Sequence, residues 1–303
     1  MIPPLRFLAG TATAALALLA VSGLASTPVS AAACNRDCLG AVVTQYVDAI
    51  VAHDPARLPL VTADVRYTED SREVKLGEGL WKTVTGKRSF RQDYLDTGKQ
   101  IAAAHVVLLE DKNPILYSVV LHVKDRKISG IETLVQRILP DSRFQPTELG
   151  QPLVGMNERL SVEKRQPRDV MIRTALAYTE GLRIGSFVDA PTPFAKEAYR
   201  IENGVFMAGT GCARPDCPAI LTQKIMKHPD VKASVAAVDE ENGTVLLWMN
   251  FGDTNSYGPG NALMTFEGFK VWDSQIHVVH AFFRTVPKDT QRNWPSSDPL
   301  PGG

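Results

Sequence analysis

The feature that most constrains the fold of this chain is an order of elements that its sequence runs through twice. The first pass opens with apolar residues at helical spacing over 39–52. Alternation typical of a strand follows at 64–68, and a variable stretch comes after it. Turn residues then separate three β-rich runs, at 104–110, 115–124 and 128–138.

The second pass repeats this order from residue 170 onward. It has a helical stripe over 170–182, a strand end at 199–203, and late strands at 231–238, 244–251 and 275–286. Five short matches in the same order, at offsets of 128 to 147 residues, support a duplication. They pair Tyr46 with Tyr178, Thr68–Ser71 with Ile201–Gly204, Glu110–Asn113 with Asp239–Asn242, Asp125 with Asp253, and Arg137–Pro140 with Arg284–Pro287.

The duplication predicts two domains of similar size. We expect a first domain at 34–140, a Pro- and Gly-containing linker at 141–165, and a second domain at 166–290. The remaining residues, 291–303, are rich in Pro, Ser and Gly and are expected to form a flexible tail.

The first 33 residues have the parts of a secretory signal peptide. Arg6 precedes an apolar run from Phe7 to Leu24, and small residues end the segment at Ala33. The alternatives are an uncleaved membrane anchor, disfavoured by Pro28, and a lipoprotein with Cys34 as its lipidated N-terminus. We therefore expect an extracytoplasmic or secreted protein.

All four cysteines lie after this segment. An even number of cysteines in an exported protein indicates disulfides. Three pairings are open, and the local pairs Cys34–Cys38 and Cys212–Cys217 are the simplest. A zinc site is disfavoured because neither spacing is Cys-x-x-Cys.

The charge balance excludes one class of partner. The chain has 33 basic and 33 acidic residues, whereas a protein that binds nucleic acid or an anionic membrane usually has a basic excess. We therefore expect a small organic molecule as the partner.

The opening of the first domain resembles the NTF2-like superfamily, which includes SnoaL-like cyclases and ketosteroid isomerase. The resemblance rests on Tyr46, His53–Leu58, Ala63–Val65 and Thr68–Glu69. The segments Leu76–Thr83 and Tyr199–Gly204 further resemble an uncharacterised family of secreted fungal and bacterial proteins. What the superfamily implies is an α+β fold, here two tandem cones, each a curved antiparallel sheet packed on N-terminal helices around a pocket. The resemblance implies no particular reaction.

Several catalytic motifs are missing from the sequence. There is no Gly-x-Ser-x-Gly, no His-Glu-x-x-His and no P-loop, and Gly77-x-Gly79 lacks the later glycine of a dinucleotide site. We therefore expect neither a cofactor nor a metal.

Two groups of histidines are candidates for acid–base chemistry. If their strand faces coincide, His122 and Glu132 meet, and a carboxylate beside an imidazole makes a general base. The structural alternative places both on a solvated face. His277 and His280 are three residues apart on one strand, so they point to opposite faces and cannot share a metal unless a bulge intervenes.

A third group of candidates is mainly in the second half. Asp253 and Glu69 are candidate bases, and Tyr67 and Tyr257 are candidate hydroxyl donors. The remaining candidate binding residues are Arg200, Asn203 and Trp272. The alternative for Arg200 is a structural ion pair with Glu202.

Two functions remain open at this point. The first is an exported, cofactor-free lyase, isomerase or hydrolase that uses acid–base chemistry on a small carbonyl compound or sugar derivative. The second is a non-catalytic small-molecule binder or cell-surface interaction protein. Because the two domains could pair with each other, a monomer is one hypothesis, with a homodimer as its alternative.

Overall fold

The computed structural model describes residues 1–4, 33–149, 153–213 and 215–300. Contacts divide the chain into Met1–Ser30 and Ala31–Gly303. Most of the predicted signal peptide, residues 5–32, lies outside the described residues. Among those that are described, no helix is long and apolar enough to cross a membrane.

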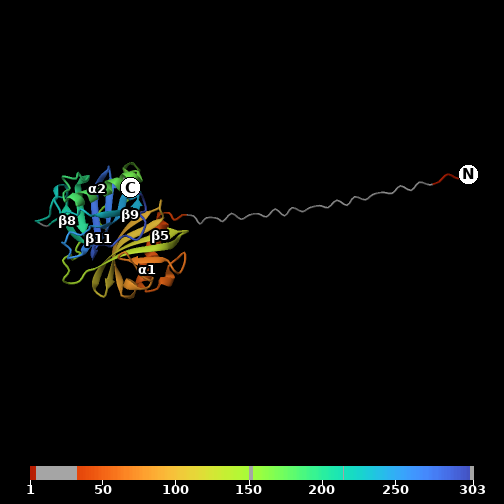
Figure 1. The fold of residues 1–303 in the computed structure, drawn as a ribbon, viewed down its shortest axis with the longest axis horizontal. Coiled ribbons are helices and arrows are strands. Elements are labelled where there is room, and N and C mark those ends of the chain that lie inside the picture. The colour runs from red at the N-terminus through yellow and green to blue at the C-terminus, as the bar shows by residue number, and fades with distance from the viewer. Residues whose placement is uncertain (5–32, 150–152, 214, 301–303) are drawn as a thin grey trace. The chain divides into compact units, whose positions relative to one another are not determined.

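The first half is one helix packed on a six-stranded sheet (Figure 1). The helix α1 begins after Asn35, whose side chain accepts a hydrogen bond from the Cys38 backbone and so satisfies one free amide. The sheet order is β2-β1-β6-β5-β4-β3, with β1 parallel to β6 and the other pairs antiparallel. Its elements are α1 (Arg36–Val51), η1 (Pro55–Arg57), β1 (Arg66–Glu69), β2 (Arg72–Glu73), η2 (Gly79–Lys82), β3 (Gly86–Asp96), β4 (Ile101–Glu110), β5 (Asn113–Lys124) and β6 (Lys127–Arg137).

The second half has the same architecture. The helix α2 ends at Gly185, which adopts the left-handed conformation common after a helix C-terminus. The sheet order β8-β7-β12-β11-β10-β9 repeats that of the first half. Its elements are η3 (Val162–Lys164), α2 (Arg168–Ile184), β7 (Phe194–Glu202), β8 (Val205–Gly209), η4 (Ile220–Thr222), β9 (Lys232–Asp239), β10 (Thr244–Asn250), β11 (Asn261–Trp272) and β12 (Gln275–Pro287).

Strand register makes the two halves equivalent residue by residue. Glu69 of β1 pairs with Thr133, and Glu202 of β7 pairs with Ala281. Each sheet has a register shift at the same place, after His122 in the first half and after Lys270 in the second. The tandem α+β organisation expected from the sequence is therefore confirmed.

Only two of the five sequence matches fall on equivalent positions. Tyr46 and Tyr178 are each the eleventh residue of their helix, and the match of Glu69 with Glu202 agrees with the strand register. The other three are wrong, because short polar turns resemble one another wherever they occur. In the structure the equivalents are Asp96 and Asp239, Asp125 and Asp273, and Arg137 and Thr285.

The hydrophobic residues form three cores. One lies between α1 and its sheet, and another between α2 and its sheet. The third joins the opposite faces of the two sheets and includes Leu116, Val120, Trp248 and Phe282. Linker residues enter this third core, since Leu149, Leu153 and Met156 are buried in it. The pairing of the two halves is thus built from a large shared apolar surface.

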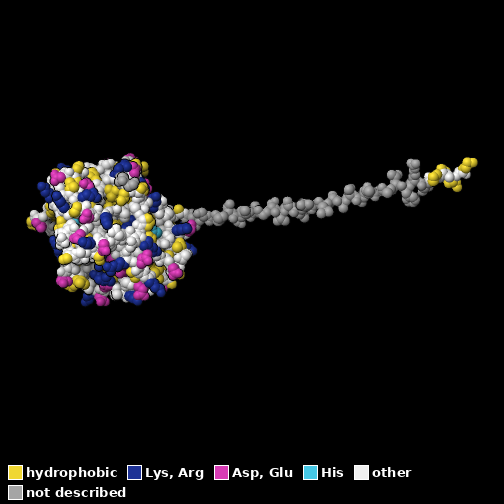
Figure 2. All heavy atoms as spheres, viewed as in Figure 1, with side chains coloured by type: hydrophobic (Ala, Val, Ile, Leu, Met, Phe, Trp, Pro, Cys, Tyr) yellow, Lys and Arg dark blue, Asp and Glu magenta, His cyan; other side chains and the backbone are white. Residues whose placement is uncertain are grey.

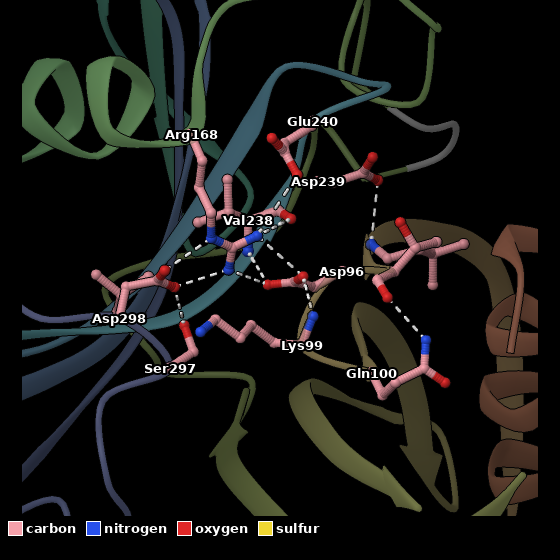
Figure 3. Close-up of polar contacts among 12 residues, drawn as sticks. Asp96, Lys99, Gln100, Arg168, Val238, Asp239, Glu240, Ser297 and Asp298 are labelled. Carbon is pink, nitrogen blue, oxygen red and sulfur yellow. Dashed lines mark hydrogen bonds and ion pairs between the residues drawn. The ribbon is translucent and has the colours of Figure 1, made fainter. Parts of the chain in front are cut away.

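Ion pairs cross between the halves reciprocally. Arg36, at the start of α1, contacts Asp239 of the second half at 2.5 Å. Its equivalent Arg168, at the start of α2, contacts Asp96 of the first half at 2.5 Å (Figure 3). Each aspartate also accepts a backbone N–H of the other half, from Leu95 or Val238 at 3.0 and 2.9 Å. Such a self-complementary pattern is the geometry of a two-fold symmetric interface.

The C-terminal segment differs from the expected flexible tail. Arg292 is 3% exposed in its side chain and forms a bidentate ion pair with Glu132 of the first half. Trp294 stacks on His122 with ring centroids 4.6 Å apart, and Asp298 pairs with Arg168 (Figure 3). The prediction is wrong for residues 292–298, because their polar and aromatic side chains find partners on both halves.

Both local cysteine pairs form disulfides. Cys34 bonds to Cys38 at the start of α1, and Cys212 bonds to Cys217 in the loop after β8. The simplest of the three pairings is therefore confirmed. Two disulfides are consistent with an extracytoplasmic protein.

Candidate functional site

A cavity of about 760 Å³ opens on the concave side of the second sheet. Its walls come from α2, from strands β6, β7, β8, β11 and β12, from the segment 138–144, and from the loops at 223–228 and 251–257. This volume suits a drug-sized molecule. Its apolar walls include Met207, Ile225, Phe251, Leu263 and Phe283.

Four polar side chains form the inner end of the cavity. Arg200 of β7 donates to the Tyr178 hydroxyl at 3.3 Å and pairs with Glu202 at 2.9 Å. Glu267 of β11 lies on the same concave face and is 1% exposed. Burial acts to lower the pKa of Arg200, but Tyr178 and Glu202 raise it above its ordinary value. Arg200 is therefore a permanent cation in this group.

Glu267 has the chemistry of a buried acid. Burial and, secondly, the negative charge of Glu202 raise its pKa to about 8, against the lowering effects of Arg200 and Tyr178. Its Oε2 atom has no hydrogen-bond partner among the described residues. Near neutral pH, Glu267 therefore holds a proton that it can donate to a ligand.

His228 lines the same cavity and is 4% exposed. Burial lowers its pKa, so the imidazole is neutral at pH 7. Its Nδ1 atom has no hydrogen-bond partner in the described part of the chain. The cavity thus holds a protonated carboxyl group and a neutral imidazole, which can give and take a proton respectively.

Three of the residues predicted from the sequence line this cavity: Arg200, Asn203 and Tyr257. Arg200 also makes the predicted ion pair with Glu202, so its structural and functional roles coincide. Both polar groups of the Asn203 side chain bind the backbone of Phe283 at 2.9 Å. Asn203 therefore joins β7 to β12 and leaves ligand contact to its neighbours.

The structure brings His122 and Glu132 together, with Nε2 and Oε1 at 2.9 Å. Their faces coincide, which was the condition for the pair, but it is the face of the sheet that α1 does not cover, outside the cone. Burial acts to raise the pKa of the Glu132 carboxyl group, but the positive charge of Arg292 holds that pKa below its ordinary value. With Arg292 on the carboxylate and Trp294 stacked on the imidazole, this pair is structural.

Asp253, His277 and Trp272 do not line the cavity, contrary to their prediction as site residues. Asp253 pairs with Lys288 at 2.8 Å on the surface. His277 bonds to Glu197 at 2.8 Å and stacks on Trp272. His277 is near the start of β12 and Trp272 ends β11, whereas Asp253 belongs to the 251–257 loop without lining the cavity itself. Spacing along the sequence does not reveal this separation.

His280 faces the other sheet, on the same face of β12 as Val278 and Phe282, while the register shift between Ile276 and Val278 interrupts the alternation at His277. It is buried between the halves, where Nδ1 is 3.0 Å from Gln92 Nε2 and 3.2 Å from His105 Nδ1. No group of three or more His, Cys, Asp or Glu side chains is arranged to hold a metal within the described ranges.

Tyr67 and Glu69 lie in the first half, at the positions equivalent to Arg200 and Glu202. The Tyr67 hydroxyl donates to Glu69 Oε2 at 2.9 Å, and the same oxygen accepts the Leu80 backbone N–H at 2.9 Å. Tyr117 and Tyr46 share a hydrogen bond of 2.8 Å beside them. Aromatic side chains thus occupy the space that forms the cavity in the second half.

The sequence interpretation missed Glu267, His228 and the functional role of Tyr178. The strand that carries Glu267, β11, was itself not predicted. The available signal is a single acidic residue in the apolar run Leu263–Val271, since an unpaired carboxylate is rarely buried in a strand without a function.

Comparisons with known proteins give no reaction. Residues 164–283 match a family model described as a domain of unknown function (DUF8021). No curated protein is significantly similar to the chain. A crystal structure of a proposed ketosteroid isomerase from Kribbella flavida DSM 17836 matches at 16% identity and a TM-score of 0.27. The match covers 42% of this chain and 93% of that chain, and a TM-score this low carries no argument.

Proposed function

We propose that the cavity of the second half binds a small, partly apolar carbonyl compound and moves a proton on it without a cofactor. The observation that carries this proposal is Glu267, a buried carboxyl group that lines the cavity with an unpartnered oxygen. A neutral carboxylic acid in an apolar site donates a strong hydrogen bond to a carbonyl oxygen, which develops negative charge when an adjacent C–H bond is broken.

The other residues have complementary roles in this proposal. Tyr178 and Arg200 supply further positive potential at the inner end, and Glu202 holds Arg200 in place. His228 accepts the proton through Nδ1. The reaction class is then an isomerisation or elimination that begins with proton abstraction beside a carbonyl group, or a hydrolysis in which His228 takes a proton from the attacking water. We further propose that the protein is exported and that its disulfides form outside the cytoplasm.

The test compares the mature chain, residues 34–303, with its variants Glu267→Gln and His228→Gln. Turnover is measured on a panel of carbonyl compounds and sugar acids. General acid–base catalysis contributes about 10²–10⁴-fold, so each variant should lose at least about 100-fold in kcat/KM on any active compound. Asp253→Asn is the control, because Asp253 lies outside the cavity lining. Full turnover by Glu267→Gln would reject the catalytic role. Binding without turnover by the native chain would instead favour a non-catalytic binding protein.

A further inference from the structure

We infer that the ligand of this cavity is an amphipathic anion, whose apolar body fills the cavity and whose negative group lies at the mouth between Arg143 and Lys224. The inference rests on the proposed function for the location of the site. It adds the chemical class of the ligand, which Glu267 and Tyr178 do not define.

Charge is unevenly distributed along the cavity. Four cations and two carboxyl groups line it: Arg143, Arg200, Lys224, Arg284, Glu202 and Glu267. Arg200 pairs with Glu202, and Arg284 pairs with Asp70 of the first half. Glu267 is neutral near pH 7, because burial raises its pKa to about 8. Within the described residues, the lining cations without a carboxylate partner are therefore Arg143 and Lys224.

These two cations mark the outer end of the cavity. Both are exposed, whereas Arg200, Tyr178 and Glu267 at the inner end are buried. Figure 2 shows acidic and basic side chains mixed over the viewed face of the molecule. A local excess of positive charge at the mouth of an apolar cavity attracts and orients an anion.

Arg143 is held at the mouth by aromatic contacts. Its guanidinium lies 5.6 Å from the ring centroid of Phe144, which packs edge-on against Phe283 of the cavity wall at 5.3 Å. A cation over an aromatic face is attracted by the ring. The linker that carries Arg143 therefore contributes a charge to the site of the second half.

Lys224 approaches from a different segment, which is fixed to the end of α2. Lys224 forms a β-bridge with Ser186, and the backbone N–H of the neighbouring Ile225 donates to the Gly185 carbonyl at 3.0 Å. The backbone at Lys224 is thus anchored, and the residue is exposed. Two cations from separate segments can bind one anionic group such as a carboxylate or sulfonate.

The test uses two fluorescent probes with the same aromatic body, 8-anilino-1-naphthalenesulfonate and the uncharged N-phenyl-1-naphthylamine. Titration into the mature chain should show the sulfonate binding about tenfold more tightly, which equals about 1.4 kcal/mol. The double variant Arg143→Gln/Lys224→Gln should reduce sulfonate binding to the level of the neutral probe. Binding of the neutral probe should stay within about twofold.

Two further variants control the test. Arg126→Gln/Lys127→Gln removes one arginine and one lysine from the exposed β5–β6 turn, outside the cavity lining, and should change neither affinity. Thr265→Tyr should fill the cavity and weaken both probes at least about tenfold. Equal affinity of the native chain for the two probes would overturn the inference. So would tight sulfonate binding by Thr265→Tyr, because the anion would then bind elsewhere.

The inference and the proposed function can fail separately. If the neutral probe binds in the cavity as tightly as the sulfonate, the ligand class is wrong while the site stands. If the sulfonate binds as expected but Glu267→Gln keeps full turnover, the ligand class stands and the acid–base role of Glu267 is wrong.

Discussion

The two halves of this protein share one backbone plan, yet one cone is filled and the other is open. Strand register makes Tyr117 of β5 equivalent to Thr265 of β11, and Val119 equivalent to Glu267. The partners of the first pair on β6 and β12 are Val135 and Phe283, and those of the second pair are Thr133 and Ala281. In the first half, Tyr117 reaches Tyr46 and closes the space beneath the helix. In the second half, Thr265 leaves that space empty, and Glu267 faces it.

The difference shows how few side chains separate a structural domain from a candidate site. A buried tyrosine replaces a threonine, a valine replaces a glutamate, and Tyr67 replaces Arg200. Protein interiors are packed closely, so one large residue decides whether a cavity exists at all. The fold supplies the cone, and these three positions decide its use.

The largest expected loss of stability is at Asp96 and Asp239, the buried aspartates that occupy equivalent positions in the two halves. Removal of one member of a buried ion pair costs about 3–5 kcal/mol in unfolding free energy. Asp239→Ala should cost more than Asp96→Ala, because Arg168 keeps Asp298 as a partner whereas Arg36 has no second carboxylate partner among the described residues. Urea denaturation of both variants measures the difference. The reverse order would show that Asp298 contributes little.

The next effect is a pH dependence of stability that comes from Glu267, whose equivalent in the first half is the apolar residue Val119. The folded-state pKa of about 8 lies above the ordinary value of 4.5, so between these values the folded chain holds a proton that the unfolded chain has lost. The contribution of Glu267 to stability is thus complete below about pH 4.5 and is lost as the pH rises through about 8. Glu267→Gln should remove this loss and stabilise the protein above pH 8 by up to about 4 kcal/mol.

The measurement is the free energy of unfolding from pH 5 to pH 9 for the native chain and for Glu267→Gln. Glu69→Gln is the matched control in the first half, where the carboxylate already accepts two hydrogen bonds. Parallel pH profiles for the native chain and Glu267→Gln would contradict a raised pKa.

A smaller effect is expected when the filled cone is opened. Tyr117→Thr removes a fully buried ring and leaves the Tyr46 hydroxyl without its partner, at a cost of about 3 kcal/mol. It should also create a site for the neutral naphthylamine probe in the first half. A second binding event in the titration of this variant would support the comparison, and unchanged stability would contradict it.

The smallest effect compares the two disulfides. Both close short loops, with sequence separations of 4 and 5 residues, and a loop of that length contributes about 2 kcal/mol in the chain-entropy account. Cys34→Ser/Cys38→Ser and Cys212→Ser/Cys217→Ser should therefore lower the unfolding free energy by similar amounts. Thermal unfolding of both double variants tests this, and a large difference would show that one bridge also holds surrounding structure.

Local patterns were sufficient to predict much of the fold. The helical stripe before Ala52 and the alternating runs up to Arg137 correspond to α1 and β4–β6, because amphipathic periodicity is written directly into the sequence. The strand at Asn261–Trp272 was missed, because apolar residues occur on both of its faces and alternation is lost.

The candidate site could be predicted only in part. Arg200 and Tyr257 were identified by residue type, but their convergence with Glu267 depends on strand register across β7, β12 and β11. The sequence left open whether His122 and Glu132 meet as a catalytic pair or lie on an outer face, and in the structure they meet on the face that α1 does not cover. The face that a strand turns to its helix is set by long-range packing, and neither short-range spacing nor residue type contains that information.

The reciprocal ion pairs of Arg36 and Arg168 have a consequence for variation in this protein. When two identical chains associate through a two-fold axis, every substitution is introduced twice, once in each subunit. A cone filled by a tyrosine would then be filled in both copies, and no site would remain. Joining the two copies in one chain removes this coupling, so the halves can keep a common interface while one loses its cavity and the other acquires chemistry.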